Sequence, residues 1–113
     1  MIYSRPHFEH ILIEIFDVKS INKTKEFCEK IEIFVDKCRL NVVKKTKYKF
    51  SKAGFTFVFI LSESHIIFHS WPEMNYLNID FMSCSPIKNL NKIIFLAKEM
   101  FDSKNVILKK YNQ

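Results

Sequence analysis

The sequence contains few of the residues that most often interrupt regular structure. Its 113 residues include one glycine and three prolines. The three cysteines are an odd number without CxxC spacing, which argues against a disulfide framework and a zinc knuckle. No apolar run approaches the roughly 20 residues that span a bilayer, and the first residues lack the apolar stretch of a signal peptide. We therefore expect reduced thiols, a cytoplasmic protein and no membrane partner.

Lysine, rather than arginine, supplies most of the positive charge. Only two of the 18 basic residues are arginine, and the net charge is +6. Lys45, Lys47 and Lys49 alternate within a stretch that has no acidic residue, as on one face of a strand. Lysine-rich strands commonly prevent a sheet edge from pairing with other chains. We therefore favour a solvated strand face and no nucleic-acid partner, with nucleic acid or an anionic ligand as the alternative.

Apolar residues make up 48% of the chain, and twelve are phenylalanine. The length fits one domain over residues 1–113. Periodicity of two or of three to four predicts strands and helices along it. The expected strands are 10–16, 40–50, 55–62, 66–71, 76–83 and 105–109, and the expected helices are 22–38 and a second one after residue 85. We interpret these as an α+β two-layer sandwich, a mostly antiparallel sheet with two helices on one face, in the order β-α-β-β-β-α-β.

Two local signals refine these boundaries. Ser85 and Pro86 form a typical helix start, with Ser85 as N-cap and Pro86 at the first helical position. Residues 51–54 are expected to turn between two strands, with Gly54 supplying a positive φ. Residues 72–75 are expected to form a further turn.

The segment from Glu63 to Glu73 concentrates reactive groups in eleven residues. It holds the hydroxyls of Ser64 and Ser70, the imidazoles of His65 and His69, and two carboxylates. A serine hydroxyl can attack the preceding carbonyl, here that of Glu63, when the backbone is strained and an acid or base is close. On the residues alone, Ser64 is more often a turn serine. His65 and His69 would lie about 13 Å apart in a strand, so we expect no metal site.

Two blocks in this segment resemble the prokaryotic S-adenosylmethionine decarboxylase proenzymes. They are Glu63-Ser64-His65-Ile66 and His69-Ser70-Trp71-Pro72-Glu73. The resemblance implies self-cleavage between Glu63 and Ser64, giving residues 1–63 and 64–113. It also implies that Ser64 becomes a pyruvoyl cofactor that forms a Schiff base with the substrate. The expected function is decarboxylation of S-adenosylmethionine for spermidine biosynthesis, by a homodimer of cleaved chains.

The same resemblance assigns roles to five further residues. It implies that His69 and the Thr56 hydroxyl serve processing, and that Cys84 is the proton donor. Glu73 is expected to bind the ribose hydroxyls of the substrate, and Phe50 to stack on its adenine ring. On the residues alone, His69 is more often a hydrogen-bonded strand histidine, Cys84 and Phe50 core residues, and Glu73 a solvated turn acid.

Four positions depart from the family pattern, at Asp17, Tyr48, Phe57 and Ser85. We expect these side chains to crowd the walls of the substrate pocket. Two alternative functions therefore stay open. One is a related pyruvoyl-dependent ornithine or arginine decarboxylase. The other is a non-catalytic paralogue that uses the lysine-rich strand as a binding module.

Overall fold

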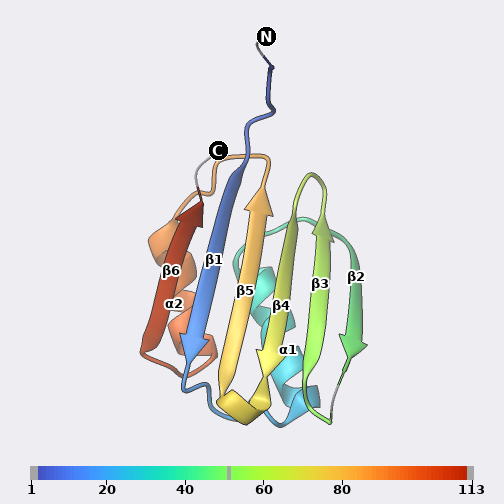
Figure 1. Cartoon of the computed structure of the whole chain (residues 1–113), viewed down its shortest axis with the longest axis vertical. Helices are drawn as coiled ribbons and strands as arrows, with labels where there is room; N and C mark the ends of the chain where they lie inside the picture. The colour runs from blue at the N-terminus through green and yellow to red at the C-terminus, as the bar shows by residue number, and fades with distance from the viewer. Residues whose placement is uncertain (1–2, 51, 112–113) are drawn as a thin grey trace.

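The computed structural model describes residues 3–50 and 52–111. They form a single six-stranded sheet with two α-helices on one of its faces (Figure 1). The strands lie in the order β2-β3-β4-β5-β1-β6, and every pairing between neighbours is antiparallel. The elements are β1 Glu9–Phe16, α1 Thr24–Lys37, β2 Val42–Lys49, β3 Phe55–Leu61, β4 His65–Trp71, a single 3-10 turn η1 Pro72–Met74, β5 Tyr76–Ser83, α2 Leu90–Met100 and β6 Asn105–Tyr111.

The predicted two-layer α+β sandwich is confirmed, but the predicted order of elements is wrong by one strand. Four strands, not three, separate the two helices. Residues 66–71 and 76–83 were both expected to be extended. Each forms a separate strand, because η1 reverses the direction of the chain between them. The sheet is therefore antiparallel throughout.

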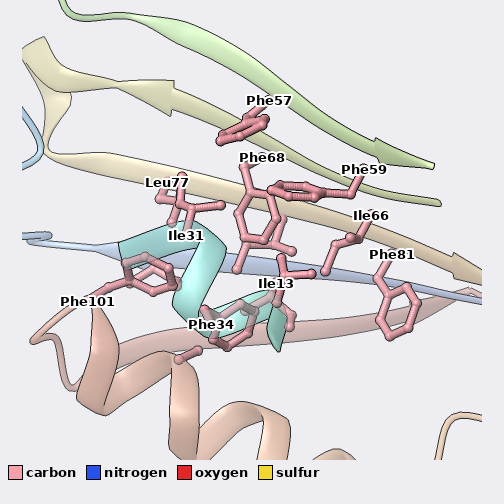
Figure 2. Packing of buried hydrophobic residues seen from close by; sticks show 14 of the residues in the cluster. Ile13, Ile31, Phe34, Phe57, Phe59, Ile66, Phe68, Leu77, Phe81 and Phe101 are labelled. Atoms are coloured by element: carbon pink, nitrogen blue, oxygen red, sulfur yellow. The ribbon is translucent and has the colours of Figure 1, made fainter. Parts of the chain in front are cut away.

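The core lies between the helices and the face of the sheet that they cover. Alternate residues of each inner strand point into it, as the period of two in the sequence predicts. Eight phenylalanines and eight isoleucines make up most of the buried residues in this layer, and Figure 2 shows part of their packing. The ring of Phe34 on α1 meets that of Phe68 on β4 edge-on, with centroids 6.0 Å apart, and lies 5.5 Å from Phe101. These contacts join both helices to the sheet.

We expect Phe34→Ala to lower the free energy of unfolding by about 3–5 kcal/mol, because it removes a fully buried ring from the centre of this layer. Urea denaturation followed by circular dichroism would measure the change. Phe95→Ala is the matched control, since Phe95 on α2 is 59% exposed, and its effect should stay below about 1 kcal/mol. Equal losses from the two variants would contradict the described packing.

The predicted helix start at Ser85–Pro86 is wrong, because α2 begins at Leu90. Two side chains outside the helix take the backbone donors of this segment. The Ser85 N–H donates to the hydroxyl of Ser83 (3.1 Å), and the Ile87 N–H donates to a carboxylate oxygen of Glu9 on β1 (2.9 Å). These bonds hold residues 85–87 against the end of the sheet, so the helix starts one turn later.

The expectation of a positive φ at Gly54 is also wrong. Within the described residues, no glycine has a positive φ, and Ser51 in the same predicted turn lies outside them. The Gly54 carbonyl instead accepts a hydrogen bond from the Phe50 N–H (3.0 Å), which closes the β2–β3 connection. Six other residues take the left-handed conformation, four of them Asn or Asp, the types that tolerate it best: Asp17, Ser20, Arg39, Asn75, Asn89 and Asp102.

The lysine-rich strand β2 forms one edge of the sheet, and all its residues are exposed. Its alternating lysines share the face of the buried phenylalanines of β3. Lys47 lies opposite Phe57, with its ammonium 5.2 Å from the centre of that ring. Lys45 lies opposite Phe59 and forms an ion pair with Glu32 on α1. The lysines thus cover the outer margin of the core on the helix side.

Candidate active site

The face of the sheet opposite the helices, here called the open face, is covered by neither helix and is turned toward the viewer in Figure 1. It mixes apolar and polar side chains from alternate strand positions. These are Lys44, Thr46 and Tyr48; Thr56, Val58 and Ile60; His65, Ile67, His69 and Trp71; Tyr76, Asn78, Asp80 and Met82; His10, Leu12, Glu14 and Phe16; and Asn105, Ile107, Lys109 and Tyr111.

The structure brings Ser64 and Cys84 together, although they lie 20 residues apart. Ser64 ends the tight turn between β3 and β4, where its carbonyl accepts a hydrogen bond from the Leu61 N–H (2.9 Å). Cys84 directly follows β5, the next strand in the sheet. The Cys84 N–H donates to the Ser64 hydroxyl at 3.1 Å. Cys84 is exposed and not a core residue, so its thiol is accessible to a bound molecule.

Thr56 and His69 form a second pair on the neighbouring strands β3 and β4. They lie directly opposite each other, and the Thr56 hydroxyl is 3.1 Å from Nδ1 of His69. The His69 ring is half-buried next to Trp71, with centroids 6.0 Å apart. Burial lowers the pKa of His69, and the charge of Asp80 partly opposes this effect. The imidazole is therefore held by a hydroxyl in a site that favours its neutral form.

Glu73 and Phe50 lie at the end of the sheet nearer to His69. Glu73 is exposed in η1, which follows β4. Phe50 follows the last residue of β2, and its side chain is 48% exposed rather than part of the core. Figure 1 shows η1 and the end of β2 at the bottom of the sheet. Both side chains can therefore reach a ligand, and their proposed substrate contacts stay predictions.

These residues fall into two groups at opposite ends of the sheet. The Ser64 end holds Ser64 and Cys84, and the Glu73 end holds His69, Thr56 and Glu73, as the directions of β4 and β5 in Figure 1 make clear. Five strand residues from Ser64 to His69 correspond to about 17 Å. That distance is far beyond the reach of a proton transfer. Within one chain, Ser64 and His69, to which the resemblance assigns cleavage and processing, therefore lie too far apart to exchange a proton directly.

The four departures from the family pattern have separate structural roles. Tyr48 lies on the open face opposite Thr56, where it does border the candidate site. The expectation that Phe57 crowds a pocket wall is wrong, because it is buried on the helix side of the sheet. Asp17 has a φ of 55° in the turn after β1, a conformation that glycine adopts easily. Ser85 belongs to the loop before α2.

A line of polar side chains across the open face was not among the predicted site residues. The Tyr76 hydroxyl donates to Glu14 (2.7 Å) and accepts a hydrogen bond from Asn78 (3.0 Å). Asp80 lies 2.6 Å from Nε2 of His10. The sequence held a signal for it, because polar residues alternate with apolar ones along residues 76–83.

The described residues contain neither a metal site nor a membrane-spanning helix. In residues 3–50 and 52–111, no three His, Cys, Asp or Glu side chains are grouped closely enough to hold a metal ion. Within the same ranges, no helix has the length and apolar character needed to cross a membrane.

Comparison with known proteins is consistent with this arrangement. The model of the family described as S-adenosylmethionine decarboxylase matches residues 9–113. An S-adenosylmethionine decarboxylase proenzyme of Clostridium botulinum (strain Loch Maree) is 32% identical over 103 residues, covering 89% of this chain and 84% of that protein. The proenzyme of Clostridium kluyveri is 37% identical over 101 residues, with coverages of 86% and 79%. That of Archaeoglobus fulgidus is 32% identical over 94 residues, with coverages of 81% and 84%.

A solved structure agrees at the level of the fold. The crystal structure of the adenosylmethionine decarboxylase from Aquifex aeolicus superposes with a TM-score of 0.78 at 21% identity, covering 97% of this chain and 92% of that one. At this identity the likeness speaks for the fold. The family match and the relatives above 30% identity go further, and they show that the chain belongs to the S-adenosylmethionine decarboxylase family.

Proposed function

We propose that this protein is a self-processing, pyruvoyl-dependent decarboxylase that converts S-adenosylmethionine to its decarboxylated form and carbon dioxide. The product would serve as the aminopropyl donor for spermidine biosynthesis. One observation carries the proposal beyond family membership. The hydroxyl of Ser64, in a tight turn at the end of the sheet, is hydrogen-bonded to the backbone of the exposed Cys84.

Self-processing requires only groups of the protein and one water molecule. The Ser64 hydroxyl oxygen adds to the Glu63 carbonyl carbon, the peptide C–N bond breaks, and an ester with a free α-amine forms. Loss of the Ser64 α-proton then expels the Glu63 carboxylate from Cβ and leaves dehydroalanine. Water converts the nitrogen-bearing carbon to a ketone and releases ammonia. His69, assisted by the Thr56 hydroxyl, would move the protons.

The residues around Ser64 fit a pyruvoyl group at this position. The Ser64 hydroxyl oxygen leaves with Glu63 during processing, which would free the Cys84 N–H to donate to a carbonyl oxygen of the pyruvoyl group nearby. When formed, the pyruvoyl ketone supplies an electrophile that takes up the electrons released with carbon dioxide. The Cys84 thiol would return a proton to the substrate carbon. Glu73 would accept hydrogen bonds from the ribose hydroxyls, and Phe50 would stack on the adenine ring.

The separation of the two groups supports a homodimer with a shared site. A second copy stacked on the open face with its strands reversed would place its Glu73 end over the Ser64 end of the first copy. His69, Thr56, Glu73 and Phe50 of one subunit would then act on Ser64 and Cys84 of the other. By two-fold symmetry the dimer would contain two such sites.

The composition of the open face supports the same stacking. An antiparallel sheet with one face in water normally carries polar side chains on that face. Here Ile60 and Ile107 are 44% and 47% exposed on it, and Leu12, Ile67 and Trp71 are partly exposed as well. An apolar patch of this kind is typical of a protein interface. A second copy would bury it.

Carbon dioxide release from labelled S-adenosylmethionine, ornithine and arginine tests the reaction. We expect release from S-adenosylmethionine alone, because Phe50 offers an aromatic face for adenine. Cys84→Ala should lower turnover by about 10²–10⁴-fold, the usual contribution of a general acid. Cys38→Ala is the matched control and should leave turnover unchanged, because Cys38 lies at the end of α1 away from the open face. Release from ornithine or arginine instead would reject this substrate.

A further inference from the structure

The strands carry two carboxylates on the open face, those of Glu14 and Asp80. Their negative charges are paired with different kinds of positive group. Glu14 lies 3.3 Å from the ammonium of Lys109 and accepts a hydrogen bond from Tyr76. The Tyr76 hydrogen bond and the neighbouring Lys109 lower the pKa of Glu14, so this carboxylate is ionised and paired with a permanent cation. Its field on the rest of the face is therefore largely cancelled.

Asp80 has a different partner. Within the described residues its one side-chain partner is His10, at 2.6 Å, and both side chains are about one-third exposed. A histidine carries a charge only when it is protonated. The Asp80–His10 pair is thus neutral when His10 is protonated, and it carries one negative charge when His10 is neutral.

Asp80 also lies near His69, across the pairing of β5 with β4. Asn78 lies directly opposite His69 on β5, and Asp80 is two residues further along the same face. Such diagonal neighbours lie about 7–8 Å apart. The other titratable or charged groups on this face are Lys44 and Tyr48 on β2, His65 on β4, Tyr76 on β5, His10 and Glu14 on β1, and Lys109 and Tyr111 on β6.

We propose that Asp80, held by His10, is a positioning residue for His69 that allows this half-buried imidazole to carry a proton. The inference rests on the proposed self-processing, in which His69 must both accept and release protons. Burial disfavours the imidazolium, and Asp80 is the carboxylate close enough to offset that cost. His10 weakens this effect of Asp80 when it is protonated, because its positive charge then cancels the negative charge of Asp80.

Nuclear magnetic resonance titration of His69 tests this directly. The titration uses the uncut Ser64→Ala chain as the parent. Each further substitution is made in this chain, and the resulting His69 titration is compared with that of the parent. The His69 signal is assigned by its loss in His69→Asn. We expect Asp80→Asn to move the His69 titration to lower pH, because the imidazolium loses its nearby anion. His10→Gln removes the compensating cation and should move the titration to the same or a higher pH. Asp102→Asn removes an exposed, distant carboxylate and should have no effect.

A titration unmoved by Asp80→Asn would overturn the proposal. So would a shift to lower pH in His10→Gln, or an equal shift in Asp102→Asn. In chains that keep Ser64, the pH midpoint of self-cleavage should move in the same directions as the titration. Absence of cleavage at every pH would instead reject the proposed function, and the titration in the Ser64→Ala chain would still decide the role of Asp80.

Discussion

Mass spectrometry under denaturing conditions should detect two fragments, residues 1–63 and 64–113, and a single intact chain for Ser64→Ala. The hydroxyl of Ser64 is the nucleophile in the proposed rearrangement, because Ser64 directly follows the Glu63 carbonyl in the chain. Without it the peptide bond after Glu63 cannot become an ester. The second fragment of the native protein should also begin with a ketone in place of an amine. The variant should release no carbon dioxide from S-adenosylmethionine.

Ser62→Ala provides a matched control for this result. Ser62 lies in the same turn, is exposed, and carries the same hydroxyl two residues before the proposed nucleophile. This variant should still be cut. If the native chain stays whole at all pH values and incubation times, or if Ser64→Ala is cut as the native chain is, the self-processing account is wrong.

Co-expression of Ser64→Ala and His69→Ala chains should restore cleavage that neither variant shows alone. In a mixed dimer, Ser64 comes from one chain and His69 of the partner subunit from the other, which recreates one complete site. Random pairing makes about half of the dimers mixed, so about a quarter of all sites should work, given two-fold symmetry. The two chains can carry different affinity tags, and sequential purification isolates the mixed dimer for assay.

A control separates sharing between subunits from other kinds of rescue. A chain carrying both Ser64→Ala and His69→Ala, paired with the wild-type chain, places the two lost groups in different sites, so neither site is complete. That mixed dimer should be inactive, although it contains one native chain. Activity in this dimer, together with none in the first, would mean that each site is built within a single chain.

Local patterns in the sequence were enough for most of the fold. Alternation in residues 10–16, 55–62 and 76–83 predicted the inner strands, because every second side chain there is buried. Apolar residues spaced by three and four from Phe27 to Val35 predicted α1, because this spacing places them on one buried face of a helix. The Glu63–Glu73 segment also predicted the family, since its residue order is specific. The roles of individual residues in it stay predictions.

Features that depend on distant contacts could not be predicted this way. The late start of α2 depends on Glu9, which is 78 residues away from its partner Ile87. The side of the sheet to which Lys47 points depends on its register with Phe57 on the next strand. The hydrogen bond between Cys84 and Ser64 likewise depends on β4 and β5 being neighbours in the sheet, since the two residues lie 20 positions apart.

The strand order has a consequence for the chain after a cut at Glu63–Ser64. The first fragment would keep β1, β2 and β3, and the second would keep β4, β5 and β6. Of the five ladders in the described sheet, three join strands from different fragments, namely β3 with β4, β5 with β1, and β1 with β6. In particular, β1 lies between β5 and β6, which both belong to the other fragment. The two fragments would therefore stay associated through these strand pairings, and they could separate only if the sheet unfolded.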